Sequence, residues 1–144
     1  MAVLKLSSDL FCDYKLIAVH TGLEDYRLAY FLNKRLHIFL KKKAEEACFA
    51  DVETGKFFSC YEWEDKNSQV RWFCIANKVF VDDLSVAYLL NTHKKVDFFL
   101  KIDTEGRVDM VNLLREIGKI PSTTAYEIDI DTLNKKYKLI FQEC

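Results

Sequence analysis

The three histidines are the first residues to consider for chemistry, because imidazole is both a common general base and the commonest nitrogen ligand of metals. His20, His37 and His93 are widely separated, and none belongs to an HExxH or CxH motif. His20 and His37 flank the first predicted helix, so helical rise places them about 25 Å apart. We therefore expect three separate imidazoles, partly buried or at the surface, and no metal site.

Carboxylate pairs are the next candidates, since a hydrolytic dyad needs two carboxyl groups about 5–10 Å apart across a cleft. The sequence contains three acidic pairs: Glu24–Asp25, Asp82–Asp83 and Asp129–Asp131. Each pair falls at the expected end of an element, where Asp and Glu serve as caps, turn residues or partners of the helix dipole. We favour this structural role over a catalytic one.

The cysteines form an odd set of five without a CxxC or CxH pair: Cys12, Cys48, Cys60, Cys74 and Cys144. Cys60 and Cys74 lie in apolar stretches, which predicts buried, reduced thiols. Cys144 is the last residue, and we expect it to be exposed. Glycine-rich phosphate loops and GxSxG and HExxH motifs are missing from the sequence, so no cofactor or metal is predicted.

Basic residues gather in three short runs, Lys41–Lys43, Lys94–Lys95 and Lys135–Lys136. Lysines beside an aromatic sheet are typical of RNA-binding domains, in which the rings stack on bases. No RNP-type motif is found, however, and the net charge of −1 provides no global attraction to nucleic acid. RNA binding is therefore the weaker alternative to a solvated strand end.

Length and composition indicate how these residues are held. The chain has 144 residues, half of them hydrophobic and 14% aromatic, which favours a single globular domain spanning 1–144. No apolar run reaches the length of a signal-peptide core or the ~20 residues of a membrane span. The sequence thus predicts a cytoplasmic protein that does not enter a membrane.

The first predicted unit is a β-α-β segment. An unbroken apolar run at 16–19 predicts a strand that is covered on both faces. Thr21 and Glu24 fit a capping box, which starts a helix whose apolar positions recur at helical spacing over 28–36. A second strand over 38–42 completes the unit.

The rest of the chain predicts a hairpin and a second β-α-β unit. Alternating side chains at 57–63 and 70–76 indicate two antiparallel strands with aromatics on both faces. The stretch 82–92 is predicted as a short helical turn or an irregular strand. A strand, a helix and a strand follow at 96–102, 108–117 and 124–130, and the apolar tail after them is expected to be docked.

These elements predict an α+β fold, a two-layer sandwich whose helices cover one face of a mostly antiparallel sheet. A ferredoxin-like arrangement is the leading guess for its two β-α-β units. The sheet then carries aromatic side chains that are too numerous to leave in water: Phe57, Tyr61, Trp63, Trp72 and Phe99. A homodimer through this aromatic sheet face would bury them.

Several segments, taken in order, resemble the bacterial IPExxxVDY family. They span about residues 14–141: Leu23–Leu28, Leu32–Lys34, Val96–Ile102, Thr124–Ile128 and Leu139–Phe141. The chain departs from the naming motif, since Leu90-Asn91-Thr92 replaces Ile-Pro-Glu and Phe98 replaces the final Tyr. No role of that Glu or that phenol therefore carries over. The family is uncharacterised, so the resemblance implies a cytoplasmic bacterial protein and supplies no activity.

Asp25, Arg27 and Asn33, within the first resembling segments, are the candidate residues for binding a partner or ligand. Asp25 and Arg27 do not face each other on a helix, so Arg27 is free to bind a carboxylate elsewhere. Two roles stay open for this cluster. One is a structural clamp, for example to the C-terminal strand, and the other is a contact with a partner or ligand.

The leading functional hypothesis is a non-enzymatic module that binds a protein partner or a small ligand. It rests on the missing catalytic motifs and on the surplus of aromatic residues. An RNA-associated accessory protein is one alternative. An enzyme of unrecognised type is the other, and a cluster of ionisable residues in a deep pocket would favour it.

Overall fold

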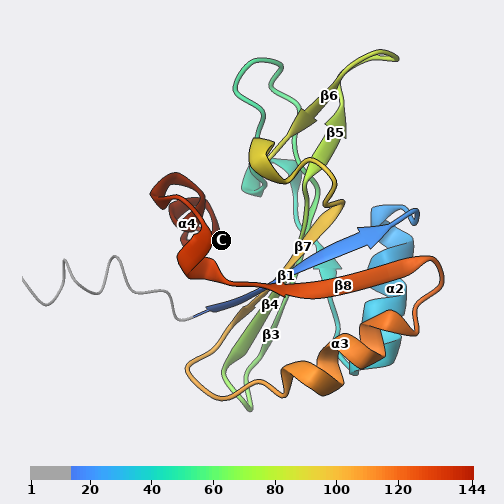
Figure 1. Ribbon diagram of the computed structural model, residues 1–144, viewed down its shortest axis with the longest axis vertical. Helices are drawn as coiled ribbons and strands as arrows, with labels where there is room; N and C mark the ends of the chain where they lie inside the picture. Colours follow the sequence, from blue (N-terminus) through green and yellow to red (C-terminus); the bar gives the residue numbers. More distant parts are fainter. Residues whose placement is uncertain (1–13) are drawn as a thin grey trace, which may run out of the picture.

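The structure, a computed structural model, describes residues 14–144 (Figure 1). Its centre is a six-stranded sheet in the order β2-β3-β4-β7-β1-β8, and every neighbouring pair is antiparallel. The strands are β1 (Tyr14–Thr21), β2 (Lys41–Lys42), β3 (Cys60–Asp65), β4 (Val70–Ala76), β7 (Phe98–Asp103) and β8 (Thr123–Ile128). A separate hairpin consists of β5 (Lys78–Phe80) and β6 (Val86–Tyr88).

Three α-helices accompany the sheet in the described residues: α2 (Asp25–Leu36), α3 (Met110–Gly118) and α4 (Lys135–Gln142). The 3₁₀ turns are η1 (Glu45–Ala47), η2 (Asn91–His93) and η3 (Ile130–Thr132). None of the described helices has the length and apolar character needed to cross a membrane. The fold is α+β with a mostly antiparallel sheet, which confirms the predicted class.

The two β-α-β connections differ in how many strands they cross. β7 and β8 run parallel because β1 lies antiparallel between them, and α3 joins them across β1. β1 and β2 also run parallel, but three strands separate them. The chain therefore returns from α2 to the far edge of the sheet. The apolar run at 16–19 is fully buried within β1, as its pattern predicted.

The predicted capping box at the start of α2 is wrong. Glu24 is the residue that precedes the helix, and its side chain forms no capping hydrogen bond. The Thr21 hydroxyl instead accepts the N–H of Leu23 (3.1 Å) and bonds to the hydroxyl of Thr123 on β8 (2.9 Å). Thr21 is the last residue of β1, so its side chain is oriented by the sheet before the helix begins.

The sheet is covered on both faces, whereas the sequence predicted helices on one face only. α2 and α3 lie together on one side, which we call the helical face, and α4 lies on the other (Figure 1). Phe141 of α4 is fully buried, with its ring centroid 5.1 Å from that of Phe99 on β7. The predicted docking of the chain end is therefore confirmed.

The aromatic residues that suggested a homodimer are divided between these faces. Phe99 is covered by α4, while Tyr61, Trp63 and Trp72 pack against the apolar cluster of the helical face. Much of this aromatic surface is thus buried within a single chain, and no second copy is needed to cover it. Trp63 and Trp72 stay half-buried. The homodimer itself stays a prediction.

Asn77, between β4 and β5, is fully buried and ties a long connection to the sheet. Its Nδ2 donates to the carbonyl oxygens of His93 (2.8 Å) and Val96 (2.9 Å), and its Oδ1 accepts the N–H of Leu90 (2.8 Å). The stretch 82–92 contains β6 and the start of η2, so each predicted alternative is found in part of it.

Candidate functional site

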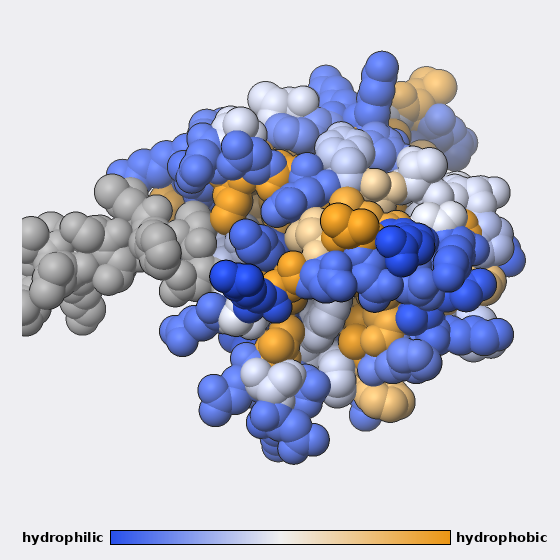
Figure 2. All heavy atoms as spheres, turned by 60° about the horizontal axis from the view of Figure 1, so that its bottom comes forward, coloured by the Kyte–Doolittle hydropathy of each residue, from blue (hydrophilic) through white to orange (hydrophobic). Residues whose placement is uncertain are grey.

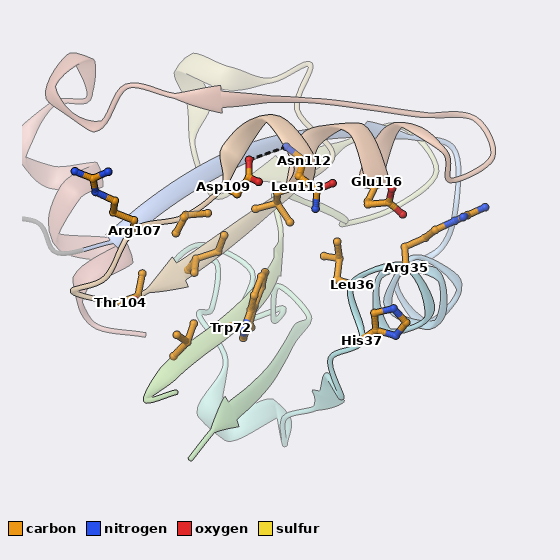
Figure 3. A pocket seen from close by; sticks show the side chains of 13 residues that line it. Arg35, Leu36, His37, Trp72, Thr104, Arg107, Asp109, Asn112, Leu113 and Glu116 are labelled. Atoms are coloured by element: carbon orange, nitrogen blue, oxygen red, sulfur yellow. Dashed lines mark hydrogen bonds between the residues drawn. The ribbon is translucent and has the colours of Figure 1, made fainter. Parts of the chain in front are cut away.

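The candidate site is a pocket of about 330 Å³ at the C-terminal end of α2, which we call the Trp72 pocket (Figure 3). α2, α3, β4, β7 and the connection after β7 each contribute to it. Its lining residues are Arg35, Leu36, His37, Val70, Trp72, Ile102, Thr104, Arg107, Val108, Asp109, Asn112, Leu113 and Glu116. On the side of the molecule that carries α3, hydrophobic side chains surface between hydrophilic ones (Figure 2).

The sheet provides the apolar floor of the pocket. Residues of one parity face the helices, so Val70 and Trp72 of β4 lie on the same side as Ile102 of β7. Trp72 and Ile102 are direct cross-strand neighbours. Ile102 is fully covered, whereas Val70 and Trp72 are half-buried, so water still reaches the β4 part of the floor, the indole included.

The end of α2 provides one wall. His37 terminates the helix in the left-handed conformation (φ 56°), which is uncommon for a residue other than glycine. Asn33 holds the chain beyond this turn, because its side chain donates to the carbonyl oxygen of Leu40 (3.2 Å) and accepts the Leu40 N–H (2.8 Å). Leu36 and His37 are thereby fixed against the pocket (Figure 3).

The start of α3 provides the opposite wall. Asp109 caps this helix by accepting the N–H of Asn112 (3.2 Å), and the Thr104 hydroxyl accepts the N–H of Gly106 (3.0 Å) in the preceding turn. Leu113 points from α3 toward the floor, and Arg107 precedes the helix (Figure 3). The carboxylate of Asp109 is thus occupied by its own helix.

The charges around the pocket are unevenly paired. Lys119 donates to Glu116 (2.8 Å), and this bond, helped by the nearby charges of Arg35 and Arg115, lowers the pKa of the Glu116 carboxyl. Arg35 and Arg107 lie at opposite ends of the pocket (Figure 3). Within the described residues, neither guanidinium forms an ion pair or a hydrogen bond.

The predicted residues Asp25 and Arg27 lie at the other end of α2, outside this pocket. Asp25 Oδ2 is 3.9 Å from Lys42 Nζ, and Arg27 is 3.8 Å from Glu24 across an exposed turn. Such exposed pairs contribute little to stability. Arg27 therefore pairs within its own helix start and does not clamp the C-terminal strand.

Asn33, the third predicted residue, has the structural role described above and does not line the pocket. The predicted residues thus lie on the helix that forms a wall of the site, whereas Arg35, His37 and Arg107 were not predicted. Trp72 had been noted only as an aromatic side chain that needed cover. Trp72 is identified as a candidate binding residue by its half-burial at the end of a helix, and this half-burial depends on the fold.

The thiols show strong effects of burial. Burial raises the pKa of Cys60 to about 12 and also raises the pKa of Cys74. Cys144, which was predicted to be exposed, is half-buried beside α4, and burial raises its pKa to about 11. Cys12 lies outside the described residues. From residue 14 onward, no group of three or more His, Cys, Asp or Glu side chains could hold a metal ion.

The histidines are held by separate neighbours. His20 Nε2 lies 3.4 Å from the hydroxyl of Tyr126 on β8, and His93 Nδ1 lies 2.8 Å from the hydroxyl of Thr92. His37 is the histidine that lines the Trp72 pocket. The pocket therefore combines an apolar floor with one imidazole and with two arginines at its rim, whose side chains extend outward (Figure 3). This arrangement suits a partly apolar ligand whose anionic group lies at the rim.

Comparisons of the chain with protein-family models, with curated proteins and with solved structures gave no match.

Proposed function

We propose that this protein binds a small molecule in the Trp72 pocket, and that the ligand has a flat apolar part and an anionic group. The half-buried indole of Trp72 at the floor of the pocket carries this proposal. A flat ring that stacks on the indole gains from apolar burial and from the geometry that aromatic pairs prefer. A carboxylate or phosphate on the ligand would lie at the rim, where Arg107 or Arg35 binds it once the flexible side chain turns from its outward position. The planar guanidinium group matches such anions.

The dimensions of the pocket support a small ligand. Ligand sites are typically concave, about 300–1,000 Å³ in volume and mainly apolar, with a few polar groups that fix orientation. At about 330 Å³, the Trp72 pocket lies near the lower end of this range. The ligand is therefore expected to be of the size of an aromatic carboxylate rather than a dinucleotide.

Fluorescence of Trp72 tests this proposal. The chain has two tryptophans, so the variant Trp63→Phe leaves Trp72 as the one indole. We expect an aromatic carboxylate, chosen from a panel by thermal shift, to quench this emission in a saturable way. Arg107→Gln should then weaken binding about tenfold, the loss of one charge-assisted bond.

Arg115→Gln is the matched control, because Arg115 lies exposed on α3 and does not line the pocket. An equal loss of affinity in Arg107→Gln and Arg115→Gln would indicate general electrostatic attraction and would argue against a specific site. A panel without any effect on the emission of Trp72 would contradict the proposal.

The strand order also supports a ferredoxin-like arrangement, which we propose for part of the domain. β8, β1, β7 and β4 follow one another in the sheet, with α2 after β1 and α3 after β7. A split β-α-β fold has this order of strands and helices. β3 and β2 then extend the sheet beyond β4.

Membership of the IPExxxVDY family, and with it a cytoplasmic location in bacteria, is likewise a proposal. It is supported by the order of the resembling segments. In the described chain, these segments coincide largely with elements of the fold, namely α2, β7, β8 and α4.

A protein partner is the second candidate, because the β5–β6 hairpin presents apolar side chains to solvent. Phe80 is 73% exposed and Leu84 is 98% exposed. A tagged pull-down should recover a stoichiometric partner with the native chain and lose it with the double variant Phe80→Ser, Leu84→Ser. Recovery that does not depend on these two residues would exclude the hairpin as the contact.

A further inference from the structure

A second pocket, of about 420 Å³, lies at the β2 edge of the sheet and is rich in lysine. We call it the lysine pocket. Its lining residues are Lys42, Lys43, Glu45, Cys48, Gly55, Lys56, Phe57, Ser59 and Val79. Lys42 approaches Asp25 at the N-terminus of α2, so this pocket and the Trp72 pocket lie toward opposite ends of that helix.

Backbone hydrogen bonds hold two of the lysines in place. The N–H of Lys43 donates to the carbonyl oxygen of Cys60 on β3 (2.9 Å), which fixes the end of β2. The carbonyl oxygen of Lys56 accepts the N–H of Asp51 (2.8 Å), and Gly55 closes the same loop with φ +73°. The backbone positions of Lys43 and Lys56 are therefore fixed by hydrogen bonds.

Positive charge is in excess in the lysine pocket. Within the described residues, the ammonium groups of Lys43 and Lys56 form no ion pair, and Lys42 has one long, exposed contact with Asp25 (3.9 Å). Glu45 is the one carboxylate among the lining residues. The ammonium group of Lys42 lies toward Asp25 on the helical face, whereas that of Lys43 lies over Phe73, which belongs to the other face. Lys43 and Lys56 are therefore the two cations left beside Glu45.

Two neighbours of these lysines, Asp82 and Phe73, leave their charges uncompensated. The carboxylate of Asp82 on the adjacent hairpin accepts bonds from Leu84 and Ser85 in its own turn, and these bonds lower its pKa more than Lys56 does. Lys43 Nζ lies 5.9 Å from the ring centroid of Phe73, a contact that leaves its charge uncompensated. The cations are therefore available to an anion from solution.

We propose that the lysine pocket binds the phosphate group of a small phosphorylated molecule. A phosphate carries up to two negative charges and three acceptor oxygens, and lysine binds it as a point charge. The Ser59 hydroxyl, which has no hydrogen bond to any described residue, supplies a further donor. Phe57 and Val79 form an apolar wall for the rest of the molecule.

The size and charge of the protein favour a small molecule over a long polyanion. The pocket is local, and the chain as a whole has a net charge of −1, so a nucleic-acid strand would gain little beyond the pocket. A small phosphate ester or diphosphate needs only the local cluster. This inference is independent of the ligand proposed for the Trp72 pocket.

Titration calorimetry with inorganic pyrophosphate tests the site in the full-length chain. Lys56→Gln should weaken binding about tenfold, because it removes one charge-assisted contact. Binding should also be tighter at pH 7.5 than at pH 5.5, since a phosphate group loses its second proton near pH 6. Lys43→Gln is a second variant that should also weaken binding. Its thermal unfolding midpoint is measured to show that the variant is folded.

Lys41→Gln is the matched control: it removes one positive charge from β2, two residues before Lys43, and Lys41 does not line the pocket. It should change the affinity less than twofold. Equal losses in Lys41→Gln and Lys56→Gln, or no pyrophosphate binding to the native chain at millimolar concentration, would overturn the proposal. Tighter binding of a single-stranded RNA than of pyrophosphate would overturn it as well. Trp72→Leu should leave pyrophosphate binding unchanged, which separates this test from that of the Trp72 pocket.

Discussion

The two faces of the sheet are covered in different ways, and the helical face leaves the Trp72 pocket open. There, α2 ends at Leu36, and the indole of Trp72 beyond it stays half-buried. On the other face the shorter α4 places Phe141 against Phe99, and both rings are fully buried. The difference teaches that a pocket forms where a helix ends before the strands beneath it are covered.

Truncating a buried side chain of α4, which covers the second face of the sheet, should cause the largest loss of stability. Phe141→Ala removes a fully buried ring, and we expect a loss of about 3–5 kcal/mol in the free energy of unfolding. Urea denaturation measures this loss. Leu139→Ala is the control on the same helix, since Leu139 is 40% exposed and should contribute much less. Equal, small losses in the two variants would mean that α4 is not an essential cover.

Asn77→Ala should weaken the connection that packs on the second face. It leaves the N–H of Leu90 and the carbonyl oxygens of His93 and Val96 without their partner. One buried group left unpaired costs about 1–3 kcal/mol, so the loss should reach at least this range in urea denaturation. Asn67→Ala, in the exposed β3–β4 turn, is the control. If Asn77→Ala and Asn67→Ala lower the free energy of unfolding equally, the buried hydrogen bonds of Asn77 do not contribute specifically to stability.

Trp72→Leu should separate stability from binding on the helical face. The side chain is half-buried and the replacement keeps an apolar side chain, so we expect a smaller loss of stability than the about 3–5 kcal/mol of truncating a buried Trp to Ala. Binding of an aromatic carboxylate should be lost. Trp63→Leu changes the cross-strand neighbour, which does not line the pocket, and should retain binding. Thermal melts and calorimetry give the two readouts, and retained binding in Trp72→Leu would contradict the assignment.

Glu116, at the rim of the Trp72 pocket, should give the smallest effect. Its folded pKa lies below the ordinary value of 4.5, mainly because Lys119 donates to the carboxylate. The resulting stability is present above pH 4.5 and is lost as the pH falls through the folded pKa. Solvent screening keeps this contribution small. In Lys119→Gln, carbon NMR should show the pKa of Glu116 rising toward its ordinary value; an unchanged pKa would assign the shift to Arg35 and Arg115.

Local patterns in the sequence predicted the elements that form most of the sheet. Alternation and apolar runs indicate directly whether one or both faces of a strand are buried. The run at 16–19 lies in β1, and the alternation at 70–76 coincides with β4. The capping box failed for a different reason. Thr21 bonds to Thr123, a residue on another strand about one hundred positions later, and no local pattern contains that contact.

The candidate site could be predicted only in part. α2 was selected from its sequence, and Asp25 and Arg27 stay predictions at one end of it. The Trp72 pocket at the other end depends on the pairing of Trp72 with Ile102 and on the left-handed turn at His37. Both are set by contacts between distant segments, so the residue types alone did not reveal the pocket.

The buried thiols give each face of the sheet its own chemical reporter. Cys74 lies within the cluster of the helical face, and Cys60 lies within the cluster under α4. Burial raises the pKa of Cys60 to about 12, so its thiol stays protonated at pH 7 and an alkylating reagent reacts mainly when the cover opens. In a chain whose other cysteines are replaced by serine, the alkylation rates of these two thiols would time the opening of the two faces separately.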